Sequence, residues 1–226
     1  MSVIAPAEMN LEAPEAVLQW AFETFPRLVI VASFQAESSV LIDMAFWIRA
    51  DVSVLTLDTG RLPQATHDMI DRIRDRYAID VQVVSPDAGE LEEMVGRHGV
   101  NLFYGSADNR RLCCDVRKSR PLARALEGYD AWITGVRREE TLSRRSTRVV
   151  EFDEKRQKVK VNPIARWTAD QVDEYIANEG VLVNPLVYDG YPSIGCRTCT
   201  LRVEAGADPR SGRWAGTGKT ECGIHV

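Results

Sequence analysis

Short apolar segments separated by amphipathic stretches constrain the fold of this chain more than any other feature. The segment at 28–32 is apolar at every position, which is typical of a strand buried on both faces of a parallel sheet. Further strand candidates lie at 52–57, 79–84 and 129–134. Helical spacing of apolar residues predicts helices between them, at 13–25, 40–49, 63–77 and 90–97. This alternation predicts an α/β fold with a mostly parallel, doubly wound sheet.

The pattern changes after residue 148. Segments 149–153 and 159–161 flank a polar turn, which predicts a β-hairpin. Thr168 is the predicted N-cap of a helix over 169–178. Beyond Gly180 the chain is rich in Gly and Pro, so a metal centre would help to hold it. We therefore predict three consecutive parts within one domain: an N-terminal helical segment at 1–26, an α/β part at 27–180 and a C-terminal part at 181–226.

Composition and charge exclude several classes of protein. An apolar fraction of 45% and a charged fraction of 27% are ordinary for a soluble globular protein. The chain has no apolar stretch of about 18 residues, and its first residues lack the basic region of a signal peptide, so we expect a cytoplasmic protein without a membrane partner. The net charge of −5 argues against a general nucleic-acid binder. Basic runs at 110–120 and 137–148 favour a compact anionic ligand, the alternative being solvated charged loops.

Five cysteines form an unusual set. An odd count argues against a disulfide framework. Four of them make two close pairs, Cys113–Cys114 and Cys196–Cys199. Four thiolates can hold zinc or a [4Fe–4S] cluster, and the adjacent pair favours the cluster because its separate iron atoms accept neighbouring ligands more readily. The alternative is that these cysteines are buried as small apolar residues.

Cys222 lies outside that quartet, close to the end of the sequence. A cysteine followed by glycine in an exposed tail could act as a thiolate nucleophile, with Lys219 and His225 lowering its pKa. The alternative is an incidental terminal cysteine.

Polar turns follow three of the predicted strands, at 33–39, 57–60 and 135–138. Ligands of doubly wound sheets bind outside the carboxyl ends of the strands, so we expect these turns to converge. The first turn lacks the glycines of a phosphate-binding loop, and each turn by itself could be an ordinary helix cap or βα connection.

Taken in order, the motifs of this chain resemble those of the assimilatory sulfonucleotide reductases, in particular the adenylyl-sulfate (APS) reductases. The matching segments are SFQAES, LDTG, NLFYGSADNRRLCCDVRKSRPL, TGVRRE, SIGCRTCT, DPRSGRW and KTECGIH. The resemblance implies a fold like the adenine nucleotide α-hydrolases. It makes residues 27–180 a nucleotide-binding domain, and residues 181–226 an iron–sulfur-binding segment with a mobile catalytic tail.

The resemblance also implies roles for individual residues. The four ligands of a [4Fe–4S] cluster would be Cys113, Cys114, Cys196 and Cys199. The adenosine part of the substrate would lie on two turns, at Ser33, Phe34, Gln35, Glu37 and Ser38 and at Leu57, Asp58, Thr59 and Gly60. Gly135 would approach the ribose. The cations around the phosphosulfate would be Lys118, Arg145, Arg210 and Arg213, and guanidinium groups suit oxyanions because they form paired hydrogen bonds.

The implied reaction is the reduction of adenosine 5′-phosphosulfate in assimilatory sulfate reduction and cysteine biosynthesis. Cys222 would attack the sulfur, AMP would leave, and an S-sulfocysteine would remain. Thioredoxin would then release sulfite through a mixed disulfide, since the other cysteines are assigned to the cluster. Members of the family are commonly homo-oligomers, and the sequence shows no interface pattern.

Three alternatives remain at this point. The first is a reductase of 3′-phosphoadenylyl sulfate (PAPS) or an enzyme that accepts both nucleotides. The second is an adenylating PP-loop enzyme, although Phe34 and Gln35 occupy the positions of its usual glycines. The third is an iron–sulfur or zinc regulator that binds nucleotide and has no use for Cys222.

Overall fold

The computed structural model describes residues 6, 8–217, 219, 221 and 223–224. The chain divides into two compact units, each made of separated segments. The first unit comprises Met1–Thr56, Asp68–Gln82 and Leu126–Asn184, and the second comprises Leu57–His67, Val83–Ala125 and Pro185–Val226. Our division into three consecutive parts stays a prediction.

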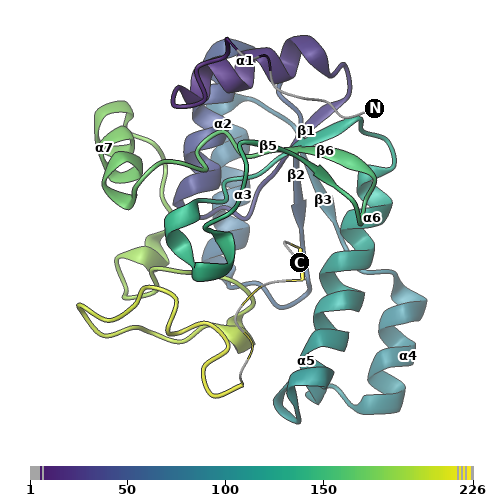
Figure 1. Ribbon diagram of the computed structural model, residues 1–226. Helices are drawn as coiled ribbons and strands as arrows, with labels where there is room; N and C mark the ends of the chain where they lie inside the picture. The colour runs from purple at the N-terminus through teal and green to yellow at the C-terminus, as the bar shows by residue number, and fades with distance from the viewer. Residues whose placement is uncertain (1–5, 7, 218, 220, 222, 225–226) are drawn as a thin grey trace. The chain divides into compact units, whose positions relative to one another are not determined.

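A six-stranded sheet is the centre of the fold (Figure 1). Its strands are β1 (Leu28–Val31), β2 (Val54–Leu57), β3 (Val81–Val84), β4 (Ala131–Ile133), β5 (Val150–Asp153) and β6 (Lys158–Val161), in the order β3-β2-β1-β4-β6-β5. The pairings β1–β2, β1–β4 and β4–β6 are parallel. The pairing of β5 with β6 is antiparallel, and it forms the predicted hairpin. The expected mostly parallel α/β sheet is therefore confirmed.

The helices complete the α/β pattern. They are α1 (Pro14–Thr24), α2 (Ala36–Ile48), α3 (Gln64–Tyr77), α4 (Ala88–His98), α5 (Ala107–Cys114), α6 (Arg120–Leu126) and α7 (Ala169–Glu179). Single turns of 3-10 helix lie at Leu102–Tyr104, Arg138–Glu140, Leu142–Arg144, Pro185–Val187 and Arg197–Cys199. Among the described residues no helix is both long and apolar enough to cross a membrane.

Local sequence explains where several helices begin. Pro14 opens α1, where its missing N–H costs nothing. Thr168 caps α7 as predicted, since its hydroxyl accepts from the Gln171 amide while the Gln171 side chain accepts from the Thr168 amide. The helix that runs through α5 and α6 was not predicted, although Ser106 caps its first turn by accepting from the Asn109 amide.

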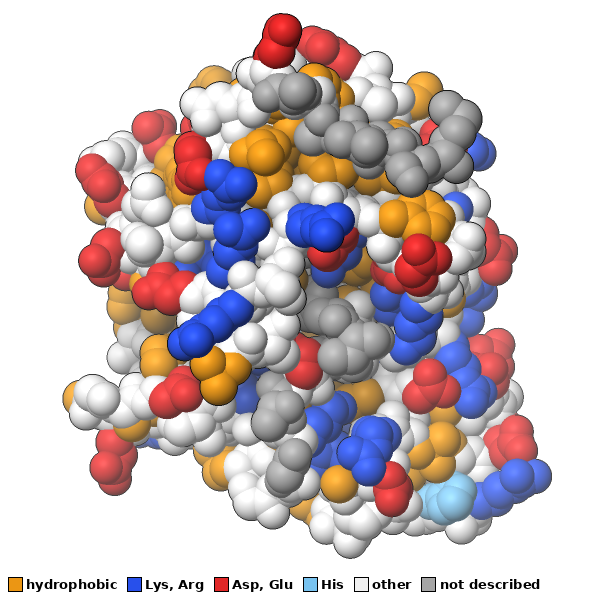
Figure 2. Space-filling view, in the orientation of Figure 1, with side chains coloured by type: hydrophobic (Ala, Val, Ile, Leu, Met, Phe, Trp, Pro, Cys, Tyr) orange, Lys and Arg blue, Asp and Glu red, His pale blue; other side chains and the backbone are white. Residues whose placement is uncertain are grey.

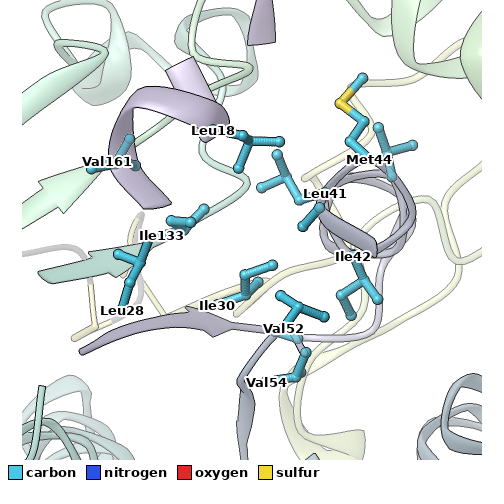
Figure 3. Close-up of a cluster of buried hydrophobic side chains, with 14 of the residues drawn as sticks. Leu18, Leu28, Ile30, Leu41, Ile42, Met44, Val52, Val54, Ile133 and Val161 are labelled. Carbon is cyan, nitrogen blue, oxygen red and sulfur yellow. The ribbon is translucent and has the colours of Figure 1, made fainter. Parts of the chain in front are cut away.

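The hydrophobic core of the first unit lies between the sheet and its helices. Strand β1 is buried along most of its length, and Leu28 and Ile30 pack with Ile133 of β4 and with Leu18 of α1 in one cluster (Figure 3). Helix α2 supplies Leu41, Ile42 and Met44 to the same cluster (Figure 3). The unbroken apolar run of β1 is thus explained by burial on both faces.

Asp43 is a carboxylate buried within that core. It is 1% exposed, and it accepts hydrogen bonds from the hydroxyl groups of Tyr77 at 2.7 Å and Tyr175 at 2.9 Å. Burial raises the pKa of both tyrosines, and the hydrogen bonds to Asp43 raise it further. One carboxylate therefore joins helices α2, α3 and α7.

The strand order reverses direction between β1 and β4, which places a topological switch point beside these two strands. The turns that follow them touch each other. A Cβ atom on Gly135 would lie 2.8 Å from the Cβ of Glu37 and 3.1 Å from its carbonyl carbon. Only glycine permits this approach, so two of the three predicted turns converge. The third turn, at 57–60, belongs to the second unit.

Replacing Asp43 with alanine is expected to lower the free energy of unfolding by about 3 kcal/mol, because two tyrosine hydroxyls lose a charged acceptor. Urea denaturation followed by circular dichroism measures the change. The control is Asp51→Ala, since the Asp51–Arg49 ion pair is exposed to solvent and is expected to contribute little to stability. Equal losses in the two variants would contradict the role of Asp43.

Replacing Gly135 with alanine is expected to destabilise the protein by about 2 kcal/mol, because backbone and Cβ atoms of Glu37 occupy the space of the new methyl group. The matched control is Gly96→Ala in α4, where no atom lies within 4 Å of the added Cβ. The control is expected to gain up to about 1 kcal/mol from helix propensity. Thermal unfolding of both variants gives the comparison, and stabilisation by Gly135→Ala would overturn the close approach.

Candidate functional site

The turn after β1 has an unusual backbone. Phe34 has a φ of 55°, in the left-handed region that glycine normally occupies, and its side chain is completely buried. A bulky residue stays in this conformation only where its surroundings hold it. The turn therefore reaches a left-handed bend without the glycines of a phosphate-binding loop.

Polar groups of the same turn lie at the start of α2. Ser33 is exposed, and its hydroxyl oxygen accepts from the side-chain amide of Gln35 at 3.2 Å. Ser38 is buried, and its hydroxyl donates to the Gln35 carbonyl at 3.0 Å. The predicted nucleotide-binding residues of this turn thus lie together, at the N-terminus of a helix where backbone N–H groups favour anions.

An ion-pair network ties this turn to the loop after β4. The Arg137 guanidinium donates to Glu37 Oε1 at 3.0 Å and to Glu139 Oε2 at 3.2 Å. The Arg137 amide donates to Glu140 Oε2 at 2.8 Å. Burial raises the pKa of Glu37, the charge of Glu140 raises it further, and Arg137 opposes both effects.

The network separates two neighbouring arginines. Arg144 is buried, and its Nη1 pairs with Glu140 Oε2 at 2.6 Å. Arg145, which the sequence singled out, is exposed. The Arg144 guanidinium is therefore paired with Glu140 within the loop, whereas the Arg145 side chain is exposed at the surface.

The cysteine quartet lies in the second unit. Cys113 and Cys114 end α5 and are followed by one π-helical turn, Asp115–Ser119, which leads into α6. Cys196 precedes a 3-10 turn, Arg197–Cys199, and Cys199 is its last residue. All four are free thiols, and Cys113, Cys114 and Cys196 are buried. π-turns inside helices occur frequently at functional sites.

Positively charged and hydroxyl groups surround the sulfur atoms. Arg110 Nη1 donates to Cys199 Sγ at 2.9 Å, and Lys219 Nζ donates to Cys114 Sγ at 3.0 Å. Thr59 Oγ1 lies 3.3 Å from Cys196 Sγ. The sulfur atoms of these cysteines therefore lie within reach of positively charged or hydroxyl groups.

Burial works against ionisation of the Cys113 thiol. It raises the pKa of Cys113, and the adjacent Cys114 adds to this effect, while Arg117 lowers the pKa. Within the described part of the chain, no three His, Cys, Asp or Glu side chains converge on the position of one metal ion. Four free thiols, two of which accept from cationic side chains, nevertheless form a donor set of the kind that binds metal as thiolates.

Two guanidinium groups support that view. Arg110 and Arg117 are 5% and 7% exposed. The Nε atom of each is buried and has no hydrogen-bond partner among the residues that the structure describes. Arg110 contacts Cys199 and Arg117 acts on Cys113, so an anionic metal–sulfide cluster bound by these cysteines would offer acceptors to the two buried donors.

The Leu57–Gly60 turn belongs to this cysteine site. The Thr59 carbonyl accepts from Arg117 Nη1 at 2.6 Å, and the Gly60 amide donates to Asp58 Oδ1 at 2.8 Å. Leu57 and Thr59 are buried, and Gly60 has a φ of 66°. The sequence assigned this turn to the nucleotide alone, but the structure shows that it also contacts the cysteine segments of its unit.

The R-x-G-R-W segment is held mainly by local contacts. Arg213 is buried and donates to the Ile194 carbonyl at 2.9 Å, with its guanidinium 4.5 Å from the Trp214 ring centroid. Arg210 Nη2 lies 3.4 Å from Glu221 Oε1.

Lys118 is half-buried within the π-turn. The predicted nucleophile, Cys222, lies outside the described residues.

Sequence reasoning missed the distinct roles of residues in the first basic run. Arg110 and Arg117 are buried beside the cysteines, whereas Arg111 and Arg120 are exposed in ion pairs. The seven-residue spacing of the buried pair corresponds to two helical turns, and this signal could have separated them. Figure 2 shows acidic side chains beside several of the basic ones.

Comparison with known proteins places these observations in a family. Residues 27–202 match the family model described as the phosphoadenosine phosphosulfate reductase domain. An adenosine 5′-phosphosulfate reductase of Mycolicibacterium smegmatis is 45% identical over 222 residues, which cover 97% of this chain and 91% of that protein. A protein of the same name from Oceanobacillus iheyensis is 42% identical over 212 residues, which cover 93% of this chain and 87% of that protein.

Solved structures agree with the fold. A phosphoadenylyl-sulfate (PAPS) reductase from Candida auris, in a phosphate complex, is similar with a TM-score of 0.73 and 27% identity, covering 88% of this chain and 100% of that chain. An FMN adenylyltransferase of Candida glabrata shares the fold alone, with a TM-score of 0.60 at 11% identity over 92% of this chain and 74% of that chain. The resemblance inferred from the motifs is confirmed: the chain belongs to the family of proteins with a phosphoadenosine phosphosulfate reductase domain.

Proposed function

We propose that this protein reduces adenosine 5′-phosphosulfate to sulfite and AMP in sulfate assimilation. The observation that carries the proposal is the similarity along nearly the whole chain to relatives named adenosine 5′-phosphosulfate reductase. The cysteine quartet supports it, because its four free thiols lie in one unit with cations on two of their sulfur atoms.

Cys222 is the proposed nucleophile. Its thiolate attacks the sulfur of the substrate, the bond from that sulfur to the bridging oxygen breaks, and AMP leaves with the electron pair. The product on the enzyme is an S-sulfocysteine. Its support is the position of the cysteine in the sequence, between Glu221, which pairs with Arg210, and Gly223, whose carbonyl accepts from Ser119.

A dithiol protein of the thioredoxin type completes the proposed cycle. One of its thiolates attacks Cys222 Sγ, sulfite leaves with the bonding electrons, and the second thiol resolves the mixed disulfide. Sulfur is reduced by two electrons while the dithiol is oxidised to a disulfide. The four other cysteines of this chain are assigned to the cluster, so the thiol comes from a partner, in a reducing compartment such as the cytoplasm.

The proposed substrate contacts are those named from the sequence. In the first unit, the turn at 33–38 and Gly135 are proposed to hold the adenosine and ribose, and Arg145 to meet the anion. The exposure of Arg145 beside the internally paired Arg144 supports this assignment. In the second unit, the proposed contacts are the turn at 57–60, Lys118, Arg210 and Arg213.

A [4Fe–4S] cluster is the proposed cofactor, with Cys113, Cys114, Cys196 and Cys199 as its ligands. When bound, it would add the field of an anionic iron–sulfide group to this site. Arg110, Arg117 and Lys219 would balance the charge on the sulfur atoms. The buried Nε donors of the two arginines support this fit.

The first test is covalent labelling. Protein purified without oxygen is mixed with APS or with PAPS, in the absence of a thiol reductant, and intact mass and peptide mapping are measured. APS is expected to add one sulfonate group to Cys222 of the wild-type protein, and the Cys222→Ser variant is expected to remain unlabelled.

The other outcomes decide between the alternatives. Faster labelling by PAPS would overturn the choice of substrate, an alternative favoured by the similarity to the Candida auris PAPS reductase. No adduct from either nucleotide, in protein that retains its iron, would overturn the covalent mechanism.

The second test concerns the cofactor. Wild-type protein is expected to contain about four iron atoms per chain, with the visible absorption of an iron–sulfur cluster. Cys196→Ser is expected to lose most of this iron because one ligand is removed, whereas Cys222→Ser is expected to keep it. Stoichiometric zinc in place of iron would contradict the cluster.

A further inference from the structure

Lys219 makes two contacts that together fix its position, apart from the charge balance already proposed for it. Its Nζ donates to Cys114 Sγ at 3.0 Å. The same nitrogen lies 5.3 Å from the centroid of the Trp214 ring. A half-buried ammonium group between a sulfur atom and an aromatic face is held at two points, in contrast to a lysine that extends into solvent.

The Trp214 ring packs against the ammonium group of Lys219. Its side chain is 4% exposed, and its φ of 51° lies in the left-handed region, so the surrounding structure holds it in a strained conformation. Two arginines also face the ring, Arg213 at 4.5 Å and Arg210 at 5.8 Å. Three cations around one buried ring indicate a fixed arrangement of positive charge.

The described residues around position 222 have two further anchors. Glu221 is 8% exposed and lies within 3.4 Å of Arg210. The Gly223 carbonyl accepts from the Ser119 hydroxyl at 3.2 Å. Ser119 and Cys114 lie at the two ends of the π-turn region, so Lys219 and Gly223 contact the same stretch of helix.

We infer that Lys219 is a positioning residue. It holds the C-terminal segment that contains Glu221 and Gly223 against the cysteine quartet by donating to Cys114 Sγ, while its ammonium group packs against the Trp214 ring. The inference rests on the proposed function, in which Cys222 is the nucleophile carried by this segment. It assigns to Lys219 a role different from the predicted lowering of the pKa of Cys222. The sulfur of Cys114 supplies the electron-rich partner, and the ring fixes the direction from which the lysine approaches.

The test compares three variants by hydrogen–deuterium exchange of the peptide that covers residues 215–226, in protein loaded with iron. Lys219→Met removes the charge and keeps the length of the side chain, Lys219→Arg keeps the charge, and Lys155→Met makes the same change at an exposed lysine in the β5–β6 turn. Exchange is expected to be roughly tenfold faster in Lys219→Met, as for loss of one charged hydrogen bond. It is expected to be largely restored in Lys219→Arg and unchanged in Lys155→Met.

A second readout separates positioning from substrate binding. The rate of Cys222 labelling by APS, measured per iron-loaded chain, is expected to fall roughly tenfold in Lys219→Met, while the Kd for AMP stays at its wild-type value. Unchanged exchange in Lys219→Met, with normal labelling of the wild type, would overturn the docking role. Absence of labelling in the wild type itself would instead overturn the proposed function, and the exchange result would still decide whether Lys219 docks the segment.

Discussion

Pairing of buried cysteine sulfur atoms with fixed cations is the interaction on which the second unit depends. Arg110 and Lys219 donate to sulfur atoms, and they come from segments more than one hundred residues apart in the chain. Burial raises the pKa of the Cys113 thiol, and the charge of Arg117 opposes this effect. The Gly- and Pro-rich C-terminal segment has little apolar periodicity, and these polar contacts hold it where a hydrophobic core does not.

The first unit depends on a different constraint. Two turns must lie close together at the switch point of its parallel sheet. Gly135 allows the loop after β4 to approach Glu37. Arg137 then bridges the two turns through Glu37 and Glu139. The completely buried Phe34 ring holds a left-handed turn that would otherwise require glycine. Packing and ion pairs together leave Arg145 at the surface with its charge outward.

Prediction from the sequence succeeded where a signal is local. The apolar run of β1 and the capping box of α7 each depend on a few neighbouring residues, and both are present in the structure. The helix from 107 to 126 was missed because buried arginines and cysteines interrupt its apolar pattern, although Val116, Leu122 and Leu126 are buried along it. Arg110 and Arg117 are buried at helical spacing but carry charge.

The sequence by itself determined the α/β alternation, the family and the identity of the cysteine quartet, because periodicity and motif spacing are properties of the chain. Only the tertiary structure decided which cations serve which sulfur atoms, since those partners come from distant segments. It also decided that Arg144 is buried and Arg145 exposed, because the difference depends on the position of Glu140. Contacts of this kind depend on the packing of separate elements, which no local pattern encodes.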